Sequence, residues 1–298
     1  MRFGFRGGVM CAAVALSACG AGVDQENTAG EDLLPTGRGA ITLQQLGAQA
    51  QAARRPRTNG ISYHGGPVMT SGPTVYFIWY GNWSSADKSI LQNLAGSIGG
   101  SSYFNINTTY YNGSNTHVAN HVGYSTSSDL SDNYSRGTAL SDSAIQAIVA
   151  AQSPTDTNGV YFVMTSADVN ATSGFCTQYC GWHTHATING RDIKYAFVGN
   201  PARCPSACSN GTPPPNGSVG ADGAASIIAH ELEEATTDPD LNAWYDNRGF
   251  ENADKCAWTF GSTYSNGTGT ANMKLGSRDY LIQQNWVNAS GGYCAKGL

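Results

Sequence analysis

Short apolar runs and amphipathic segments alternate along the middle of this 298-residue chain. The apolar runs have the length of buried strands and lie at 74–80, 160–165 and 193–198. The amphipathic segments, at 85–98 and 141–152, have the length of helices. Strands that alternate with helices build an α/β or α+β fold in layers. We therefore predict one globular domain, residues 61–298, with a central mixed sheet, flanking helices and disulfide-linked loops.

A further helix is expected around the sequence HELEE at 230–234. Apolar residues recur there at three- and four-residue spacing, which predicts a buried stripe formed by Ala225, Ile228, Leu232 and Ala235. At about 100° per residue, His230 and Glu234 fall on the far side of this helix, with Glu231 beside them. We predict that these three polar residues share a face turned away from the core.

The spacing of this motif resembles H-E-x-x-H, in which two helix histidines hold zinc and the glutamate between them serves as general base. In this chain Glu234 stands in place of the second histidine. A zincin-like site also needs a third ligand from outside the helix, and gluzincins take theirs from a downstream glutamate. Glu251 has a comparable place, and Asp246 is the rival third ligand. A zincin-like arrangement is therefore one form that the predicted fold could take.

The expected metal centre consists of a divalent cation on His230, Glu234 and Glu251, with Glu231 as the base that deprotonates a bound water. Zinc is favoured over calcium or manganese, although the hard and anionic ligand set leaves both of these open. The alternative is that these side chains form an ordinary solvated surface of a helix.

Two further groups could support this centre. Asp254 could orient a metal ligand by a hydrogen bond. His183 and His185 alternate along an expected strand and therefore point the same way. Either could supply a missing ligand or a hydrogen bond to a transition state, and His183 is the second catalytic candidate beside Glu231. The alternative for both histidines is a pair of polar surface residues.

The first residues have the features of an export signal. A basic start precedes a short apolar stretch, and LSACG at 16–20 resembles a bacterial lipobox. We therefore expect a lipoprotein signal peptide at 1–18 and a flexible tether or pro-region at 19–60. A lipidated Cys19 would anchor the protein in a bacterial outer membrane or at the cell surface. An ordinary cleaved signal peptide and release outside the cell is the alternative.

Cysteine usage agrees with export. Of the 8 cysteines, Cys11 and Cys19 fall in the signal region, which leaves six in the expected domain. Six cysteines in an exported chain favour three disulfides. We predict local Cys176–Cys180 and Cys204–Cys208 bonds and a longer Cys256–Cys294 bond. Zinc binding by the two C-x-x-x-C pairs is the alternative.

The charge of the chain argues against one class of partner. Charged residues make up 12% of the sequence and the formal net charge is -5. Such a sequence offers no basic face for nucleic acid, so none is expected as a partner. No stretch approaches the run of about 18 apolar residues that a membrane-spanning helix requires, so we expect any membrane attachment to come from the lipid.

A set of short motifs resembles the phosphate-induced protein 1 family, also called Exordium-like. In chain order they are YHGGP at 63–67, IWYG at 78–81, TSAD at 165–168, GFC at 174–176, CG at 180–181, FVGN at 197–200 and CP at 204–205. The resemblance spans residues 64–294, and the family is known mainly for secreted cell-wall proteins of plants. Plant members carry small and apolar residues in place of His230, Glu231 and Glu234. The resemblance therefore implies a bacterial member with an added His-Glu-x-x-Glu helix.

Two functions are expected from these features. The first is an exported metal-dependent hydrolase, specifically a peptidase, that acts on a peptide or a cell-wall polymer. The second is a non-catalytic surface protein of the Exordium type, which would bind wall polymer or a partner through exposed aromatic residues such as Trp83 and Tyr103. Metal content separates the two, because catalysis needs a metal with an open water position, whereas a structural ion is fully ligated by protein.

Overall fold

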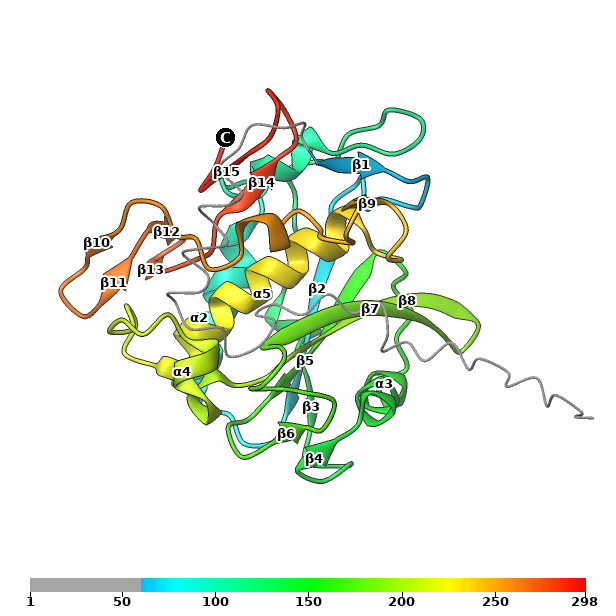
Figure 1. The fold of residues 1–298 in the computed structure, drawn as a ribbon. Helices are drawn as coiled ribbons and strands as arrows, with labels where there is room; N and C mark the ends of the chain where they lie inside the picture. Colours follow the sequence, from blue (N-terminus) through cyan, green and yellow to red (C-terminus); the bar gives the residue numbers. More distant parts are fainter. Residues whose placement is uncertain (1–59) are drawn as a thin grey trace, which may run out of the picture.

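A computed structural model describes residues 60–298, and a five-stranded sheet lies at its centre (Figure 1). The strand order is β3-β2-β5-β8-β7. All neighbouring strands are parallel except the edge strand β7, which is antiparallel to β8. The strands are β2 (Thr74–Tyr80), β3 (Leu130–Asp132), β5 (Gly159–Thr165), β7 (Gly181–Ile188) and β8 (Arg191–Val198). The predicted central mixed sheet is confirmed.

The inner strands are mostly apolar, apart from the charged residues Arg191, Asp192 and Lys194 of β8, because both faces of the sheet are covered. Every residue of β5 is buried, and β2 buries Val75 together with residues 77–80. The three apolar runs of the sequence thus form the three inner strands, with β5 and β8 extended by one and two residues at their starts.

The two helices α2 (Ser85–Ile98) and α3 (Asp142–Ala151) agree with the predicted segments. Each begins after a serine whose hydroxyl accepts a hydrogen bond from a backbone N–H of the first turn, Ser84 for α2 and Ser141 for α3. Helix α2 lies in the connection from β2 to β3, on one side of β2 in the sheet. Helix α3 lies in the connection from β3 to β5, which crosses back over β2 to its other side. Right-handed crossovers in opposite directions put helices on opposite faces. Figure 1 shows α3 across the strands from α5 and α2.

Helix α5 (Val219–Thr237) carries the HELEE motif and packs against α2, β7 and β8. Small residues in its first turns also permit a close approach to η3 (Pro201–Arg203) and to Asn200 before it. A Cβ atom added to Gly220 would lie 2.5 Å from Asn200, and one added to Gly223 would lie 2.9 Å from Pro201. The helix ends at Thr237, because Pro239 disfavours a helical Asp238.

Helix α5 is buried around its whole circumference from Gly220 to Thr237. The prediction that His230, Glu231 and Glu234 face away from the core is therefore wrong. Segments far away in the sequence cover the side that the spacing left open, including η1 (Phe104–Thr109), β13 (Arg278–Tyr280) and the chain that follows β9 (Trp244–Asp246).

Three disulfides form, but two of the three predicted pairings are wrong. Cys256 bonds to Cys294 as predicted, whereas the other bonds are Cys176–Cys204 and Cys180–Cys208. The physical reason lies in α4 (Pro205–Cys208), which begins after Cys204. One helical turn presents Cys204 and Cys208 on the same side, so both reach across to the segment 176–180 instead of to each other. Because all four cysteines of the two C-x-x-x-C pairs are in disulfides, the alternative that these pairs bind zinc does not hold.

The remaining strands form two-stranded ribbons around the sheet and α5. They pair β1 (Ile61–Tyr63) with β9, β4 (Ala139–Leu140) with β6 (Asn170–Ala171), β10 (Tyr264–Ser265) with β11 (Thr270–Ala271), β12 (Met273–Leu275) with β13, and β14 (Asn285–Val287) with β15 (Tyr293–Ala295). Short 3-10 helices η2 (Thr126–Ser128), η3 (Pro201–Arg203) and η4 (Asp254–Cys256) complete the fold. None of the helices within residues 60–298 is long and apolar enough to cross a membrane. The expected signal peptide, Cys19 and the tether up to residue 59 lie outside the described residues.

Candidate functional site

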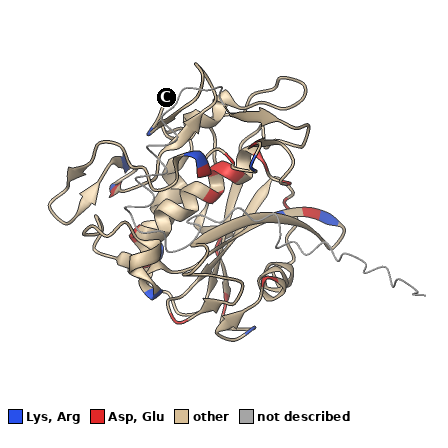
Figure 2. Cartoon of the chain, in the orientation of Figure 1, with Lys and Arg blue, Asp and Glu red and all other residues tan. Residues whose placement is uncertain are grey.

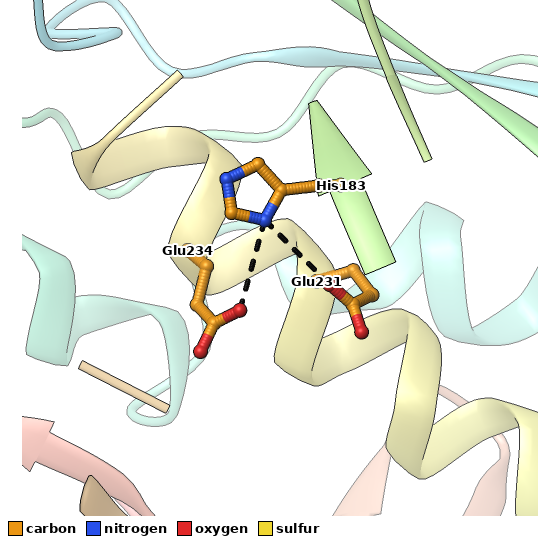
Figure 3. A group of neighbouring side chains, drawn as sticks. All are labelled: His183, Glu231 and Glu234. Atoms are coloured by element: carbon orange, nitrogen blue, oxygen red, sulfur yellow. Dashed lines mark ion pairs between the residues drawn. The ribbon is translucent and has the colours of Figure 1, made fainter. Parts of the chain in front are cut away.

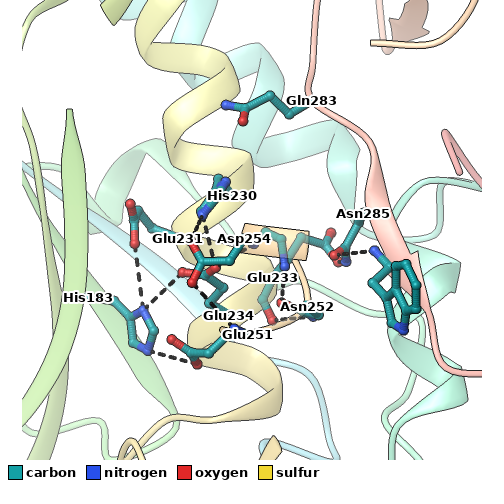
Figure 4. Close-up of polar contacts among 12 residues, drawn as sticks. His183, His230, Glu231, Glu233, Glu234, Glu251, Asn252, Asp254, Gln283 and Asn285 are labelled. Atoms are coloured by element: carbon teal, nitrogen blue, oxygen red, sulfur yellow. Dashed lines mark hydrogen bonds and ion pairs between the residues drawn. The ribbon is translucent and has the colours of Figure 1, made fainter. Parts of the chain in front are cut away.

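Three parts of the chain bring titratable side chains together beside α5 (Figure 4). Helix α5 contributes three of them, the edge strand β7 contributes one, and the segment after β9 contributes two. We call this group the buried centre; its members are His183, His230, Glu231, Glu234, Glu251 and Asp254. Figure 2 shows acidic residues concentrated around the C-terminal half of α5. Sequence reasoning named all six residues, but it did not predict their burial.

His183 faces two carboxylates of α5 (Figure 3). Its Nδ1 atom lies 3.6 Å from Oε2 of Glu231 and 3.6 Å from Oε2 of Glu234. Its Nε2 atom lies 3.3 Å from the backbone carbonyl oxygen of Asp238. A donor hydrogen bond from Nε2–H to that carbonyl leaves a lone pair on Nδ1, directed at the two carboxylates. This is how a protein orients an imidazole that binds a metal.

Glycine at the start of β7 allows Glu231 to come this close. A Cβ atom added to Gly181 would lie 2.6 Å from Ile227 and 3.0 Å from Oε1 of Glu231. The first contact is shorter than a real Cβ atom makes and the second is tight, so a larger residue at this position would require these side chains of α5 to shift. The backbone approach therefore holds Glu231 beside His183.

His230 faces the other oxygen of Glu234. Its Nε2 atom lies 2.9 Å from Oε1 of Glu234 and 3.6 Å from Oδ1 of Asp254. The same Oε1 accepts a hydrogen bond of 3.0 Å from the backbone N–H of Asp254. The prediction that Asp254 supports a metal ligand fits these contacts. Glu234 thus connects the two histidines of the buried centre, one at each of its oxygens.

The two predicted third ligands have different positions. Oε1 of Glu251 lies 3.7 Å from Nε2 of His183, and neither oxygen of this buried carboxylate has a hydrogen-bond partner. Asp246 instead accepts hydrogen bonds from the backbone N–H groups of Arg248 and Phe250, at 2.8 and 3.0 Å, and lies 3.4 Å from the Lys255 ammonium. Glu251 joins the buried centre, whereas the contacts of Asp246 organise the turn after β9.

Burial and mutual attraction shift the pKa values of the buried centre in opposite directions. Burial acts to raise the pKa of Glu234, but the two histidines outweigh it and lower that pKa to about 2. Burial raises the pKa of Asp254 to about 7, and the Glu234 carboxylate adds to this rise. Burial acts to lower the pKa of His183, but Glu251 and its other carboxylate neighbours raise that pKa well above its usual value. Without another cation, protons must therefore neutralise this group.

The atoms around His183 meet the requirements of a divalent cation. Ligand atoms about 2.1 Å from a tetrahedral zinc are separated by roughly 3.4 Å, close to the 3.6 Å from Nδ1 to each carboxylate. One imidazole nitrogen and two carboxylate oxygens are also donors that zinc accepts. Calcium normally takes six to eight oxygen ligands, so the group fits zinc better. This ligand set differs from the predicted one at two positions: His183 takes the place of His230, and Glu231, the expected base, takes the place of Glu251, so that Glu234 alone is common to both.

Glu233 is a buried carboxylate to which sequence reasoning assigned no role. It leaves α5 on the side away from His183, where the Asn285 side-chain amide donates a hydrogen bond to its Oε2 (Figure 4). Burial raises the pKa of Glu233 well above its usual value, although the hydrogen bond from Asn285 acts to lower it. A neutral, hydrogen-bonded Glu233 fits this position. The sequence indicates a role for Glu233 only through its position in the same acidic run at 230–234.

A second histidine and carboxylate cluster lies further along β7. Nδ1 of His185 lies 2.9 Å from Oδ1 of Asp192 and 3.6 Å from Oδ1 of Asp240. The Lys194 ammonium pairs with both carboxylates, at 3.2 Å from Asp240. A built-in cation therefore already compensates one of the two negative charges of this cluster. His185 does not join the buried centre.

The aromatic residues expected to contact a wall polymer are not exposed. Trp83 is 8% exposed and Tyr103 is 1% exposed, because both pack into the core beneath α2 and α5. That part of the surface-protein prediction is wrong. The large aromatic side chains that are exposed among residues 60–298 are Tyr264 and Tyr293, on the C-terminal ribbons.

These features define a class: a disulfide-linked α/β domain with a histidine and carboxylate centre buried between its main helix and the edge of its sheet. The description of the matching family is phosphate-induced protein 1 conserved region, and the match covers residues 61–278. The chain therefore belongs to the phosphate-induced protein 1, or Exordium-like, family, as its motifs predicted. Membership and the three disulfides identify an extracellular or secreted protein.

Similar plant proteins extend over most of the chain. It is 33% identical to Protein EXORDIUM-like 5 of Arabidopsis thaliana over 76% of this chain and 75% of the relative. It is also 33% identical to Protein EXORDIUM-like 3 of the same plant, over 78% of this chain and 82% of the relative. Protein PHOSPHATE-INDUCED 1 of Nicotiana tabacum is 27% identical to it over 64% of this chain and 69% of the relative. No solved structure matches the chain significantly.

Proposed function

We propose that this protein is a non-catalytic, extracellular Exordium-like protein whose fold is held together by a divalent cation, zinc in preference to calcium or manganese. The cation would bind Nδ1 of His183 and the carboxylates of Glu231 and Glu234. One observation carries this proposal: two buried carboxylate oxygens each lie 3.6 Å from the buried Nδ1 atom of His183, and the three atoms lie within 4.8 Å of one another. Such a cation would tie the edge strand β7 to α5.

Burial supports a structural role over a catalytic one. The side chain of His183 is 2% exposed, and those of Glu231 and Glu234 are fully buried. A substrate must reach a catalytic metal, whereas a structural metal is enclosed by protein. The protein would then act through its surface, on a wall polymer or a partner protein. Tyr264 and Tyr293 are the exposed aromatic side chains available for such contacts.

A metal-dependent hydrolase, specifically a peptidase, is the second candidate. The observation that favours it is the incomplete ligand set, since three protein ligands leave a fourth position for water on zinc. In that case the cation would polarise the water. Glu231 was expected to take its proton, but a Glu231 bound to the metal would leave this role to Glu251, which has no hydrogen-bond partner at either oxygen.

Metal content tests the leading proposal. Protein purified without added metal should contain at least one equivalent of zinc per chain by elemental analysis. His183→Gln should lose this equivalent, whereas His185→Gln, the matched change two residues along β7, should retain it. Absence of stoichiometric metal from the wild-type protein would overturn the proposal. Loss of metal from both variants alike would contradict the assignment of His183.

Activity on a peptide library separates the two candidates. The metal-loaded protein should cleave none of the peptides if the cation is structural. Cleavage that is abolished in both Glu231→Gln and Glu251→Gln, with the metal retained in one of them, would favour the hydrolase and name its base.

We further propose lipid anchoring at Cys19, based on the lipobox-like sequence at 16–20. Replacing Cys19 by Ser should move the protein from the membrane fraction to the soluble exported fraction, because acyl chains supply the membrane affinity. Unchanged membrane association in this variant would contradict the proposal. The host for this test is a bacterium, in keeping with the type of signal.

A further inference from the structure

We propose that the buried centre holds a second divalent cation between His230, Glu234 and Asp254, bridged to the first by the Glu234 carboxylate. This inference rests on the proposed function, because the first cation is the one bound by His183, Glu231 and Glu234. It adds a site with its own imidazole and its own carboxylate. The complete centre would be a pair of cations enclosed between α5, β7 and η4.

The two oxygens of Glu234 face different histidines. Oε2 lies 3.6 Å from Nδ1 of His183, and Oε1 lies 2.9 Å from Nε2 of His230. A carboxylate can bind one cation through each oxygen. Glu234 is therefore placed to belong to both cation sites at once.

The donor atoms of the second site lie close enough to share an ion. One ligand atom from each of His230, Glu234 and Asp254 lies within 4.8 Å of the others. The separation of 3.6 Å between Nε2 of His230 and Oδ1 of Asp254 equals the separations in the first site. One imidazole nitrogen and two carboxylate oxygens are donors that suit zinc or manganese.

His230 supplies an independent reason to expect a ligand. Its side chain is fully buried, and neither ring nitrogen has a hydrogen-bond partner with acceptable geometry. Leaving a buried polar group without a partner is unfavourable, because its lost hydration is not replaced. Nε2 nevertheless points at the space bounded by Glu234 and Asp254 (Figure 4). A cation in that space would satisfy it.

The charge of the buried centre fits two cations. It contains four carboxylates, on Glu231, Glu234, Glu251 and Asp254. Lys255, which follows Asp254 directly in the sequence, pairs with Asp246 and not with any of these four carboxylates. Histidines that bind metal are neutral, so one dication leaves two negative charges buried and two dications leave none. Bound protons are the competing way to neutralise this group, and the experiment below distinguishes them from a metal.

Metal stoichiometry is the test. Protein freed of metal by a chelator and then loaded with zinc, or separately with Mn²⁺, should bind two equivalents per chain. Asp254→Asn removes one carboxylate from the second site and keeps its backbone N–H to Glu234, so one equivalent should remain. Asp240→Asn, the matched change in the His185 cluster, should keep two. In the Mn²⁺-loaded protein, electron paramagnetic resonance should show spin-coupled ions for the wild type and an isolated ion for Asp254→Asn.

The outcomes separate this inference from the proposed function. One equivalent in the wild type, unchanged in Asp254→Asn, would overturn the second site and leave the first intact. No bound metal at all would overturn the proposed function and, with it, the pair. A second variant, His230→Gln, guards against misfolding of Asp254→Asn: it should also retain one equivalent, and two equivalents in a folded His230→Gln protein would contradict the site.

Discussion

His183 and His185 lie two residues apart on strand β7, and the Nδ1 atom of each lies 3.6 Å or less from two carboxylates. The His183 side chain is 2% exposed, whereas His185 is 38% exposed. Lys194 pairs with both carboxylates of the His185 cluster, but none of the ion pairs of the described residues brings a lysine or arginine to His183. The half-exposed cluster thus has its own cation and water around it, and the buried one has neither.

The comparison teaches that residue types alone do not define a metal site. Both clusters consist of one imidazole and two carboxylates within a few ångströms of each other. The difference is the cost of leaving the negative charge uncompensated, which is several kcal/mol per ion in the interior and small at the surface. We therefore expect changes in the buried cluster to have large effects and matched changes in the His185 cluster to have small ones.

The largest effect is expected for Glu234. Replacing it by Ala should remove the bound metal and reduce the free energy of unfolding by about 3–5 kcal/mol, because partner charges stay buried without it. Asp192→Ala, which changes the 43% exposed carboxylate of the His185 cluster, should change the same quantity by about 1 kcal/mol or less. Urea unfolding of both variants, with elemental analysis, provides the measurement. Equal destabilisation by the two changes would remove the distinction between the clusters.

A smaller effect is expected when a chelator removes the metal. A ligand present at a hundred times its Kd stabilises the folded state by about 2.7 kcal/mol, so chelation should lower the melting temperature of the wild type by several degrees. The same chelator should leave Glu234→Gln unchanged, since that variant has no metal to lose. Glu233→Gln is the control on the same helix, and it should respond as the wild type does. A wild-type protein indifferent to chelation would contradict a structural metal.

The smallest effect concerns the half-exposed cluster and appears only in acid. Burial acts to raise the pKa of Asp192, but hydrogen bonds from Lys194 and His185 and their charges lower it below its usual value. Because the folded pKa lies below the unfolded one, stability from this group is present above about pH 4 and is lost as the pH falls through that range. Since Asp192 is 43% exposed, solvent screening limits the effect to less than about 1 kcal/mol.

Asp192→Asn tests this acid dependence. The difference in unfolding free energy between wild type and variant should be measurable at pH 7 and should shrink toward zero at pH 3. Urea unfolding at both pH values gives the comparison. A difference that stays constant from pH 7 to pH 3 would show that the effect does not come from the charge of Asp192.

Much of the sheet and two of the helices could be predicted from the sequence because their patterns are local. Helix α2 buries one stripe, formed by Ile90, Leu91, Leu94, Ala95 and Ile98, and it leaves its other side partly exposed. Helix α5 shows the same kind of stripe, but its second side is covered by segments distant in the sequence, η1 before it and β13 after it. Periodicity reports one buried face and carries no information on a second face covered by distant segments.

The sequence predicted which residues form the candidate site, but it did not predict which of them contact one another. Helical spacing correctly brought Glu231 and Glu234 together, and the downstream Glu251 and Asp254 do approach the helix. Spacing could not show that His183 points at Glu231, because that contact depends on the packing of β7 against α5. The disulfide pairing had the same limit: two pairs of cysteines with equal spacing are compatible with local bonds and with bonds across.

The two disulfides that cross between the segments have a consequence for survival outside the cell. Cys176–Cys204 and Cys180–Cys208 both enclose the whole β7–β8 hairpin, whose turn at Asn189 and Gly190 is exposed. A protease that cuts this turn therefore separates no part of the protein, since the two fragments stay joined by two covalent bonds. The nicked chain should run as one band without reductant and as two with it. His183 would keep its place beside α5 after such a cut, so the domain tolerates damage at this exposed turn.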